Sequence, residues 1–552
     1  MEWLSSIIRL LLGFQVPLLA SLCCTNELAM ADTSTTKFVG CLSAALPNVR
    51  LSDILYQKND SKFTSVFDDY VRNLRYNTSN IPKPAIIVTP LTEAQVPAVV
   101  VCAKAAGIEI RIRSGGHDYE GVSYVSPAPT FIILDMFNLR SVDVTIENGT
   151  GSAWVQAGAI LGELYYGIYK KSPVHGFPAG VCPTVAVGGH FSGAGYGNML
   201  RQYGVAVDHV VDARIVNASG AILDRKGMGE DLFWAIRGGG GASFGVILAY
   251  KIELVAVPAK VTYFRVEKTV EQNGTGVVMD FQKAVTTMDS RLFVRLLLQP
   301  KTVNKKRGIK TVKITAIALF LGSTGDLVSV AKQELPSLGL NSTNCVEMSW
   351  IESVLEWANF NHTTTRPDKL LSRNPGQLKF GKRKSDYVVA AKPIPEEGLL
   401  KLWDKMKEGK VGMVFNSYGG NLAKIAADAT AFPHRAGNLY KIQYSVSWEN
   451  AGETEENLNQ AKALYEFMTQ YVSSGPRQAY LNYRDLDIGT NEKNQSSVFG
   501  PMYFHNNFQR LVQIKKKVDP DNFFRYLQKI TRKSLVQSIC SHDEHSRHSC
   551  SS

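Results

Sequence analysis

The chain has 552 residues, 45% of them hydrophobic, which is enough for a sizeable buried core and predicts two or three domains. It carries 61 basic and 49 acidic residues, a net charge of +12, but the basic residues are scattered and no nucleic-acid-binding motif accompanies them. We therefore predict no nucleic-acid partner and expect a solvated surface, with a weak attraction for polyanions as the lesser alternative.

Residues 1–31 have the pattern of a secretory signal peptide. Ile7–Cys24 is mostly apolar, and Ala29-Met30-Ala31 is a small-residue cleavage pattern. A membrane anchor is the alternative, but the unbroken apolar run is too short to span a bilayer, and no later segment has the pattern of a span. Eight Asn-X-Ser/Thr sequons favour secretion. They are Asn59, Asn77, Asn148, Asn217, Asn273, Asn341, Asn361 and Asn494.

The segment up to about Pro258 predicts an α/β arrangement. A short apolar strand over 84–90 lies between prolines, a helix follows with Thr92 as its cap, and Gly107 ends it. A second strand over 108–113 then runs directly into a glycine turn. Further strands are expected at 131–135, 153–157, 213–216 and 246–254, and a short amphipathic helix at 229–237.

After Pro258 the pattern changes to alternating strands with helices between them. Strands are predicted at 261–266, 293–299, 310–319 and 438–448, and helices near 326–335, 395–408 and 455–472. This order suits an antiparallel sheet with helices on one face. Residues 476–525 have the pattern of a return segment.

Two glycine-flanked residues carry the strongest chemical signal. His117 lies in Ser114-Gly115-Gly116-His117-Asp118, and Cys182 precedes the glycine-dense run 188–197. Glycines let backbone amides approach a bulky anionic group, so both loops are able to reach one bound cofactor. Taken singly, each residue has a plainer interpretation: a histidine satisfied in a turn and a buried thiol. We predict no metal, since no C-x-x-C or H-E-x-x-H spacing is present.

Four motifs in combination carry a resemblance to a known family. They are RSGGHDYEG at 113–121, CPTVAVGGHFSGAGYG at 182–197, FPHRAGNLYKIQY at 432–444 and NYRDLD at 482–487. With them the chain resembles plant berberine bridge enzyme-like flavoproteins, a branch of the vanillyl-alcohol-oxidase-type FAD-linked oxidases, from about Cys41 to Arg525. The resemblance implies an α+β fold, with a two-subdomain FAD-binding PCMH-type domain (41–258) and a substrate domain whose antiparallel sheet is backed by helices (259–475). A berberine-bridge-type return segment (476–530) and an atypical tail (531–552) would follow.

The resemblance also implies FAD held by two covalent bonds, from His117 to the flavin 8α-methyl and from Cys182 to the flavin C6. Cys41 and Cys102 match the family disulfide. The further cofactor-binding residues implied are Arg113, Ser114, Gly115, Gly116, Asp118, Val185, Gly188, Gly189, His190, Gly193, Gly197, Val246 and Asn482. Two departures stand out: Ala186 replaces a usual glycine, and the familiar ending is lost after Arg525.

Tyr196 matches the catalytic base of monolignol-oxidising relatives, with core packing as its plainer interpretation. A phenol is a weak base at neutral pH unless a cation stabilises the phenolate, and Lys441 is the predicted cation. Strand alternation places Lys441 and Gln443 on one face, with a solvent-facing strand edge as the alternative. By resemblance, Tyr119 and Tyr483 flank the substrate, with simple packing of either ring as the alternative.

Arg295 is a charge within an apolar strand and needs a partner. We interpret it either as a phenolate-stabilising cation or as half of a structural ion pair.

We thus expect a secreted, monomeric oxidase of the apoplast or cell wall, with a vacuolar or vesicular location as alternatives. It would convert a monolignol-like allylic alcohol, or its glycoside, to the aldehyde, with dioxygen as electron acceptor and hydrogen peroxide as product. Val185 favours oxygen as acceptor, because oxidase members carry valine there. The alternatives are a cell-wall oligosaccharide oxidase, an alkaloid or specialised-metabolite oxidative cyclase, and a catalytically silent glycoprotein that keeps the flavin.

Overall fold

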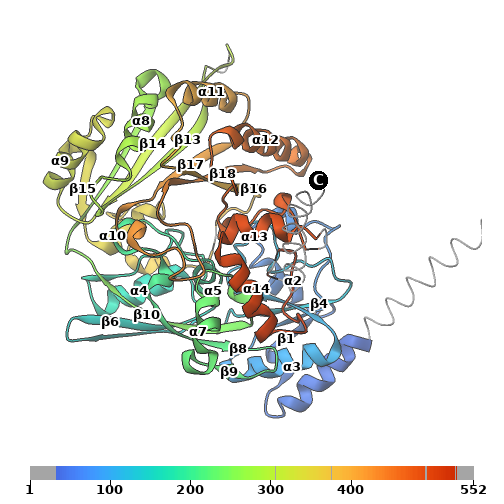
Figure 1. Cartoon of the computed structure of the whole chain (residues 1–552). Coiled ribbons are helices and arrows are strands. Elements are labelled where there is room, and N and C mark those ends of the chain that lie inside the picture. The colour runs from blue at the N-terminus through green and yellow to red at the C-terminus, as the bar shows by residue number, and fades with distance from the viewer. Residues whose placement is uncertain (1–32, 305, 375, 492–493, 529, 531–552) are drawn as a thin grey trace, which may run out of the picture.

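The fold is described from a computed structural model, which covers residues 33–530 apart from 305, 375, 492–493 and 529. The predicted signal peptide (1–31) and tail (531–552) lie outside the described residues. Figure 1 shows a lower body, built from the first half of the chain and the last helices, and an upper body built from the segment between them. No helix in the described part of the chain is both long and apolar enough to cross a lipid bilayer.

The lower body begins with a mixed four-stranded sheet in the order β1-β2-β4-β3. Its strands are β1 (Leu55–Gln57), β2 (Ile86–Val88), β4 (Phe131–Asp135) and β3 (Glu109–Arg113). β4 pairs in parallel with both β2 and β3. The predicted strand–helix–strand unit is confirmed: α3 (Val96–Ala106) follows a capping box at Thr92 and ends at Gly107, which has φ +69°.

A disulfide attaches the N-terminal helix, residues 33–45, to α3. It joins Cys41 to Cys102, whose Cα atoms are 5.6 Å apart, and confirms the predicted pairing.

The second sheet of the lower body is antiparallel, where a continued α/β pattern was expected. Its order is β5-β6-β10-β8-β9. The strands are β5 (Val142–Glu147), β6 (Thr150–Gln156), β10 (Val246–Glu253), β8 (Val210–Val216) and β9 (Ile222–Leu223). The helices α4 (Leu161–Lys171) and α7 (Arg225–Ile236) belong to the same body, and α7 kinks at Gly229.

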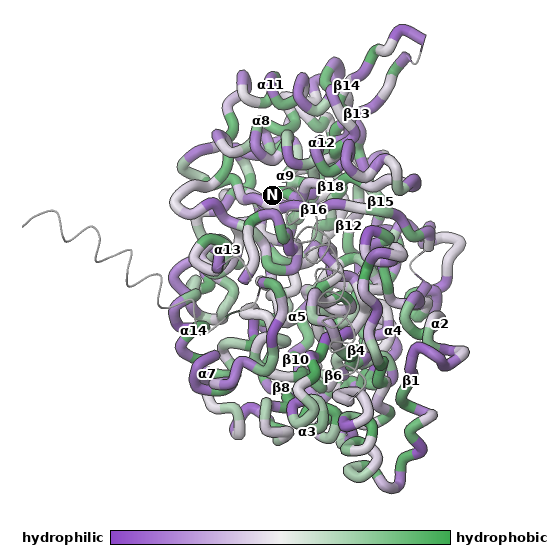
Figure 2. The backbone as a smooth tube through the Cα atoms, turned by 90° about the vertical axis from the view of Figure 1, so that its right-hand side faces the viewer, coloured by the Kyte–Doolittle hydropathy of each residue, from purple (hydrophilic) through white to green (hydrophobic). Residues whose placement is uncertain are grey.

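The upper body confirms the predicted antiparallel sheet with helices on one face. Seven strands follow the order β15-β12-β14-β13-β17-β18-β16. They are β15 (Cys345–Met348), β12 (Val261–Thr269), β14 (Ile309–Phe320), β13 (Leu292–Asn304), β17 (Gly412–Ser417), β18 (Asn438–Trp448) and β16 (Phe380–Val389). The helices α8 (Gly274–Ala284), α9 (Thr324–Glu334), α11 (Glu396–Lys407) and α12 (Thr454–Phe467) cover its outer face, and the hairpin of β13 and β14 projects from the upper end (Figures 1 and 2).

Strand alternation divides this sheet into two faces. On β18, Tyr440, Ile442 and Tyr444 belong to the core beneath the helices. The intervening Lys441 and Gln443 therefore face the lower body.

α13 (Ser496–Phe504) and α14 (Asn507–Val518) bring the chain back to the lower body, where α14 packs against α7. The chain remains packed beyond Arg525: Gln528 Nε2 donates to the carbonyl oxygens of Asp485 and Gly489 at 2.7 Å each. Residues 526–528 thus belong to the body.

Candidate active site

β3 delivers the predicted glycine loop, residues 114–119, to the wall of a deep cavity. Behind the loop, the fully buried Arg113 guanidinium donates to Asp135 Oδ2 at 2.7 and 2.9 Å. Arg113 therefore fixes the base of the loop, and its side chain does not line the cavity. Gly116 has φ +67°, and a Cβ there would lie 1.7 Å from the Tyr70 carbonyl oxygen, so only glycine fits.

The second predicted loop, residues 180–186, runs into α5 (Val187–Ser192) and borders the same cavity. Cys182 lies at the cavity wall as a free thiol, and His117 lines the same cavity. The structure therefore brings together the two residues that the sequence singled out.

The glycines after Cys182 mostly allow segments of the chain to pack closely, which differs from the expected approach to an anion. A Cβ on Gly193 would lie 2.1 Å from Asn482 Oδ1, and one on Gly197 would lie 1.7 Å from the Ala179 carbonyl oxygen. Gly197 does not line the cavity. Gly189 has nothing within 4 Å of an added Cβ and lines the cavity, so it is the glycine whose backbone lies open to a ligand.

The cavity has an inner lobe of about 330 Å³ and an outer lobe of about 150 Å³. Wall residues such as Ser114, Asp118 and Arg484 belong to both lobes, so the two form one elongated cleft. Gly188 and Gly193 line the outer lobe, which Tyr526 also borders.

Tyr196 lies at the wall of the inner lobe with its hydroxyl hydrogen-bonded to that of Tyr483. Burial raises the pKa of Tyr196, and the charge of Arg295 is the strongest influence that lowers it, followed by the Tyr483 hydrogen bond. The cation that most favours the phenolate is therefore Arg295, where the sequence had indicated Lys441.

Lys441 is fully buried and lies within a cage of tyrosine rings. Its Nζ is 3.0 Å from the ring centroid of Tyr196, 3.8 Å from that of Tyr480 and 4.4 Å from that of Tyr483. Among the described residues this nitrogen has no hydrogen-bond partner. Burial, and then repulsion from Arg295, lowers the pKa of Lys441 well below its usual value. A solvent-facing strand edge is thus excluded for Lys441.

Gln443 reaches the cavity from the same strand and donates to the Tyr119 hydroxyl oxygen at 2.8 Å. The rings of Tyr119 and Tyr483 lie 5.5 Å apart between centroids, at an angle of 34°. Both rings line the inner lobe, so it has aromatic walls that Gln443 helps to fix.

Arg295 enters the inner lobe from β13. Its Nε donates to Asn416 Oδ1 at 2.8 Å, and its guanidinium lies 4.9 Å from the Trp357 ring centroid. No carboxylate pairs with Arg295 in the part of the chain that the structure describes. The charge is therefore held by an amide and a ring, and remains directed at Tyr196.

Two known protein families match the parts of the chain that contain the two loops and the return segment. An FAD binding domain family matches residues 84–225, and the family described as berberine and berberine like matches residues 479–531. Berberine bridge enzyme-like 21 of Arabidopsis thaliana is 52% identical over 511 residues, covering 91% of this chain and 93% of that protein. The chain belongs to the berberine bridge enzyme-like family of FAD-dependent oxidoreductases.

Other similar proteins are named for different activities. Tetrahydroberberine oxidase of Berberis wilsoniae is 47% identical over 514 residues, covering 92% of this chain and 96% of that protein. The solved structure of wild-type Phl p 4.0202, a glucose dehydrogenase, has a TM-score of 0.83 and 39% identity, covering 89% of this chain and 99% of that one. Its isoleucine-to-valine variant, solved with the same TM-score and identity, is titled a glucose oxidase.

The cleft fits the FAD of this family. Its elongated form suits a dinucleotide, and the Ser123 hydroxyl on its wall has no hydrogen-bond partner among the described residues. The backbone N–H groups of Gly115, Gly116 and His117 likewise form no hydrogen bond within the described chain, so they remain available to an anionic ligand. Arg111, Arg484 and Arg525 line the outer lobe and add positive charge.

Of the two loops, that of His117 holds its side chain in the nucleophilic form, whereas the raised pKa of Cys182 favours the thiol over the thiolate. Burial lowers the pKa of His117 to about 3, with Arg72 contributing, so the imidazole is neutral; its Nε2 lies 3.0 Å from Thr184 Oγ1. Burial raises the pKa of Cys182, and Arg295 opposes that rise. His190 is also neutral, since burial and then Lys441 lower its pKa to about 3, and its Nε2 accepts the Gly180 N–H at 2.9 Å.

Some of the remaining predicted residues line the cavity, and others lie behind its wall. Val185 lines the inner lobe, whereas Val246 is fully buried and its neighbour Ile247 forms the outer-lobe wall. Asn482 lines both lobes, and its Nδ2 donates to the His190 carbonyl oxygen at 2.8 Å, which ties the return segment to α5.

Several wall residues escaped sequence reasoning. Arg484 lies within the NYRDLD motif and Tyr480 lies two residues before it, so the motif itself was a signal for them. Leu161, Leu297 and Val414 line the inner lobe but carry no chemical signal in the sequence. Tyr526, whose hydroxyl lies 2.9 Å from Ser243 Oγ, was assigned to an atypical ending instead of the cleft.

Proposed function

We propose that this protein is a secreted FAD-linked oxidase that converts a primary or allylic alcohol, such as a monolignol, to the aldehyde. The observation that carries the proposal is the position of Tyr196: it borders the same inner lobe as His117 and Cys182, close to Arg295, a cation that no carboxylate of the described residues neutralises. A base, an attachment site and a substrate space therefore meet in one lobe.

His117 and Cys182 are the residues we propose to hold FAD covalently, each from its own glycine loop. When bound, FAD supplies the acceptor for the carbinol hydride and passes the two electrons to dioxygen, which leaves as hydrogen peroxide. The chain itself supplies orientation, through the free amides of the first loop and the Asn482 contact.

Tyr196 acts as general base by taking the hydroxyl proton of the substrate. Arg295 favours the phenolate, and the hydrogen bond from Tyr483 keeps the Tyr196 oxygen in place. Loss of that proton and of a hydride from the same carbinol group turns the alcohol into an aldehyde, so the charges and electrons balance.

The walls of the inner lobe favour a flat, partly apolar substrate. Tyr119 and Tyr483 present aromatic faces, and Leu161, Leu297 and Val414 add apolar surface. Gln443 supplies an amide for a polar group of the substrate.

A sugar oxidase acting at C1 is the second candidate, because Phl p 4 is 39% identical and its variants are titled glucose oxidases or dehydrogenases. An alkaloid oxidase is less favoured despite the similarity to tetrahydroberberine oxidase. Of the cavity-lining residues that the structure describes, Asp118 is the one carboxylate, and it lies 3.6 Å from Arg484.

The deciding experiment is a peroxide-release assay on a panel of coniferyl alcohol, cello- and pecto-oligomers, glucose and reticuline. The proposal expects the highest kcat/KM with the allylic alcohol. Preference for a saccharide or for reticuline would replace it, and no peroxide with any of them would indicate a catalytically silent flavoprotein.

Secretion to the cell wall is also proposed. The Cys41–Cys102 disulfide supports an oxidising compartment. None of the eight sequon asparagines is buried, which is compatible with glycosylation. Fluorescent tagging of the full chain and glycosidase digestion of the purified protein test both points.

A further inference from the structure

β16 carries two lysines that are almost completely buried at the junction of the two bodies. The side chains of Lys382 and Lys384 are 1% and 2% exposed, and strand alternation places both on the same face. A buried ammonium is unfavourable unless carboxylates surround it. These lysines therefore have a specific role in joining the chain segments that carry their carboxylate partners.

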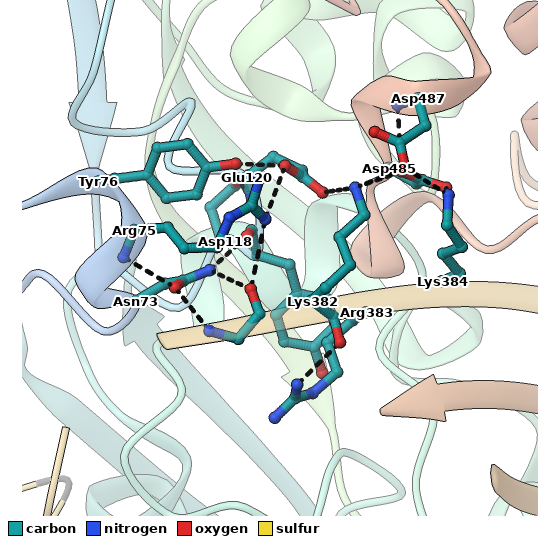
Figure 3. Close-up of polar contacts among 12 residues, drawn as sticks. Asn73, Arg75, Tyr76, Asp118, Glu120, Lys382, Arg383, Lys384, Asp485 and Asp487 are labelled. Atoms are coloured by element: carbon teal, nitrogen blue, oxygen red, sulfur yellow. Dashed lines mark hydrogen bonds and ion pairs between the residues drawn. The ribbon is translucent and has the colours of Figure 1, made fainter. Parts of the chain in front are cut away.

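Lys382 holds two separate segments with one ammonium group. Its Nζ lies 2.6 Å from Glu120 Oε1 and 2.7 Å from Asp485 Oδ1 (Figure 3). Lys384 holds the other oxygen of Asp485 at 2.7 Å and Asp487 at 2.6 Å. Lys384 thus restrains Asp485 independently, whereas of these two lysines only Lys382 reaches Glu120.

The two carboxylates are sequence neighbours of the aromatic walls. Glu120 directly follows Tyr119 and lies three residues after His117, while Asp485 lies two residues after Tyr483. The Lys382 ammonium therefore joins the segment that carries one wall of the inner lobe to the segment that carries the other.

Further contacts fix the same segment against β16. Asn73 Nδ2 donates to the carbonyl oxygens of Tyr119 at 2.9 Å and Gly381 at 3.0 Å, and Asn73 Oδ1 accepts the Gly381 N–H at 3.1 Å (Figure 3). β16 also pairs with β18 so that Ser385 lies opposite Gln443, the residue that donates to the Tyr119 hydroxyl. The strand pairing that places Gln443 and the ion pair of Lys382 with Glu120 therefore both restrain the Tyr119 ring.

The other polar groups around Lys382 are compatible with stable ion pairs between Lys382 and its two carboxylate partners. Glu120 also accepts a hydrogen bond from the Tyr76 hydroxyl and lies 3.7 Å from Arg75. Asp487, at 3.1 Å from Lys382, is half-exposed and is shared with Lys384. Three acidic and three basic groups thus balance, and no charge in the cluster is left unpaired.

We propose that Lys382 is a positioning residue, which sets the separation of the Tyr119 and Tyr483 rings by holding Glu120 and Asp485 at once. It acts through those two tyrosines and touches no substrate. The inference concerns the substrate lobe and rests on the proposed oxidase function for its kinetic readout only.

The test compares Lys382→Met with Lys382→Arg and with Arg435→Met as a matched control. Arg435 also forms a buried ion pair between the bodies, with Asp208 at 2.6 Å, but does not line the cavity.

We expect Lys382→Met to lower kcat/KM with the best substrate by roughly 10²-fold, the usual effect of misplacing reacting groups by about 1 Å. Lys382→Arg should restore most of that loss. Arg435→Met should lower the melting temperature comparably and leave kcat/KM nearly unchanged. Equal kinetic losses in Lys382→Met and Arg435→Met would overturn the proposal.

A second measurement keeps the test independent of folding losses and of the substrate. If Lys382→Met does not fold, Glu120→Gln removes one carboxylate charge and keeps its shape, and its kcat/KM should fall in the same direction. The visible circular dichroism of the bound flavin should change in either Lys382 or Glu120 variants and not in Arg435→Met, even if the wild-type protein oxidises none of the alcohols. Failure of the alcohol assay alone therefore counts against the proposed function, and an unchanged flavin spectrum counts against the role of Lys382.

Discussion

The Lys441 ammonium nitrogen lies 3.0 Å from the centroid of the Tyr196 ring and makes no hydrogen bond to the phenol oxygen. It contacts the π face, where a cation is attracted by the ring quadrupole. Because burial also lowers the pKa of Lys441, its charge is less available than that of Arg295, which lowers the pKa of Tyr196 most. The two cations beside Tyr196 therefore have different roles.

Arg295→Met should shift the pH dependence of flavin reduction further than Lys441→Met. Removing a cation destabilises the phenolate and raises the Tyr196 pKa, so the rising limb of the pH–rate profile moves to higher pH. Both variants should move in this direction, with the larger shift in Arg295→Met. Stopped-flow reduction across pH measures the shifts, and a larger shift in Lys441→Met would reverse the assignment.

Tyr196→Phe should lower the flavin reduction rate by roughly 10²–10⁴, the usual contribution of a general base. Tyr483→Phe is the matched control, because it removes the hydrogen-bond partner and keeps the base. Its reduction rate should fall less. If Tyr196→Phe reduces the flavin at the wild-type rate, the base lies elsewhere.

The flavin should remain attached when either covalent link is removed. His117→Ala and Cys182→Ala should each retain yellow colour in the acid-denatured pellet, and the double variant should lose it, because each loop supplies its own nucleophile. Release of all flavin from the denatured wild-type protein would show that neither link forms.

The sequence predicted elements best where the apolar pattern was undisturbed, as a continuous run in β4 and as alternation in β18. β4 and β18 have the predicted bounds, Phe131–Asp135 and Asn438–Trp448. β16 was missed because Lys382 and Lys384 occupy buried positions, where charge pairing replaces apolar side chains and hides the period of two. α4 was missed because two glycines weaken its local helix signal, and its buried face becomes evident only from packing.

Site residues within a sequence motif could be predicted, whereas the roles of residues whose surroundings depend on the register of the sheet could not. The loops of His117 and Cys182 follow from glycines that the backbone requires. The different roles of Arg295 and Lys441 depend on the rings and strands that surround each charge, which no local pattern encodes. Arg113 illustrates the same limit, since its motif predicted a cofactor contact and its guanidinium instead pairs with Asp135.

Gln528→Ala should destabilise the protein. The side chain satisfies the buried carbonyl oxygens of Asp485 and Gly489, and leaving a buried acceptor unpaired costs about 1–3 kcal/mol. Gln470→Ala is the control, because Gln470 is exposed. Thermal unfolding of both variants provides the comparison, and equal melting temperatures would show that residues 526–528 add nothing to the body.

Val185→Leu should slow reoxidation of the reduced enzyme in air-saturated buffer by orders of magnitude. Val185 lines the inner lobe, and interiors are packed closely enough for one extra methylene to fill a space the size of dioxygen.

Ala186→Gly should alter reoxidation little. A Cβ built on Gly115 would lie 2.9 Å from the Ala186 Cβ, so the extra methyl of Ala186 occupies space between the two loops. We therefore expect the wild type and Ala186→Gly to reoxidise within seconds, and Val185→Leu to remain reduced far longer. Stopped-flow mixing of each reduced protein with oxygen gives the rates. Slow reoxidation of the wild type that Ala186→Gly accelerates would show that this methyl, and not Val185, controls access of oxygen.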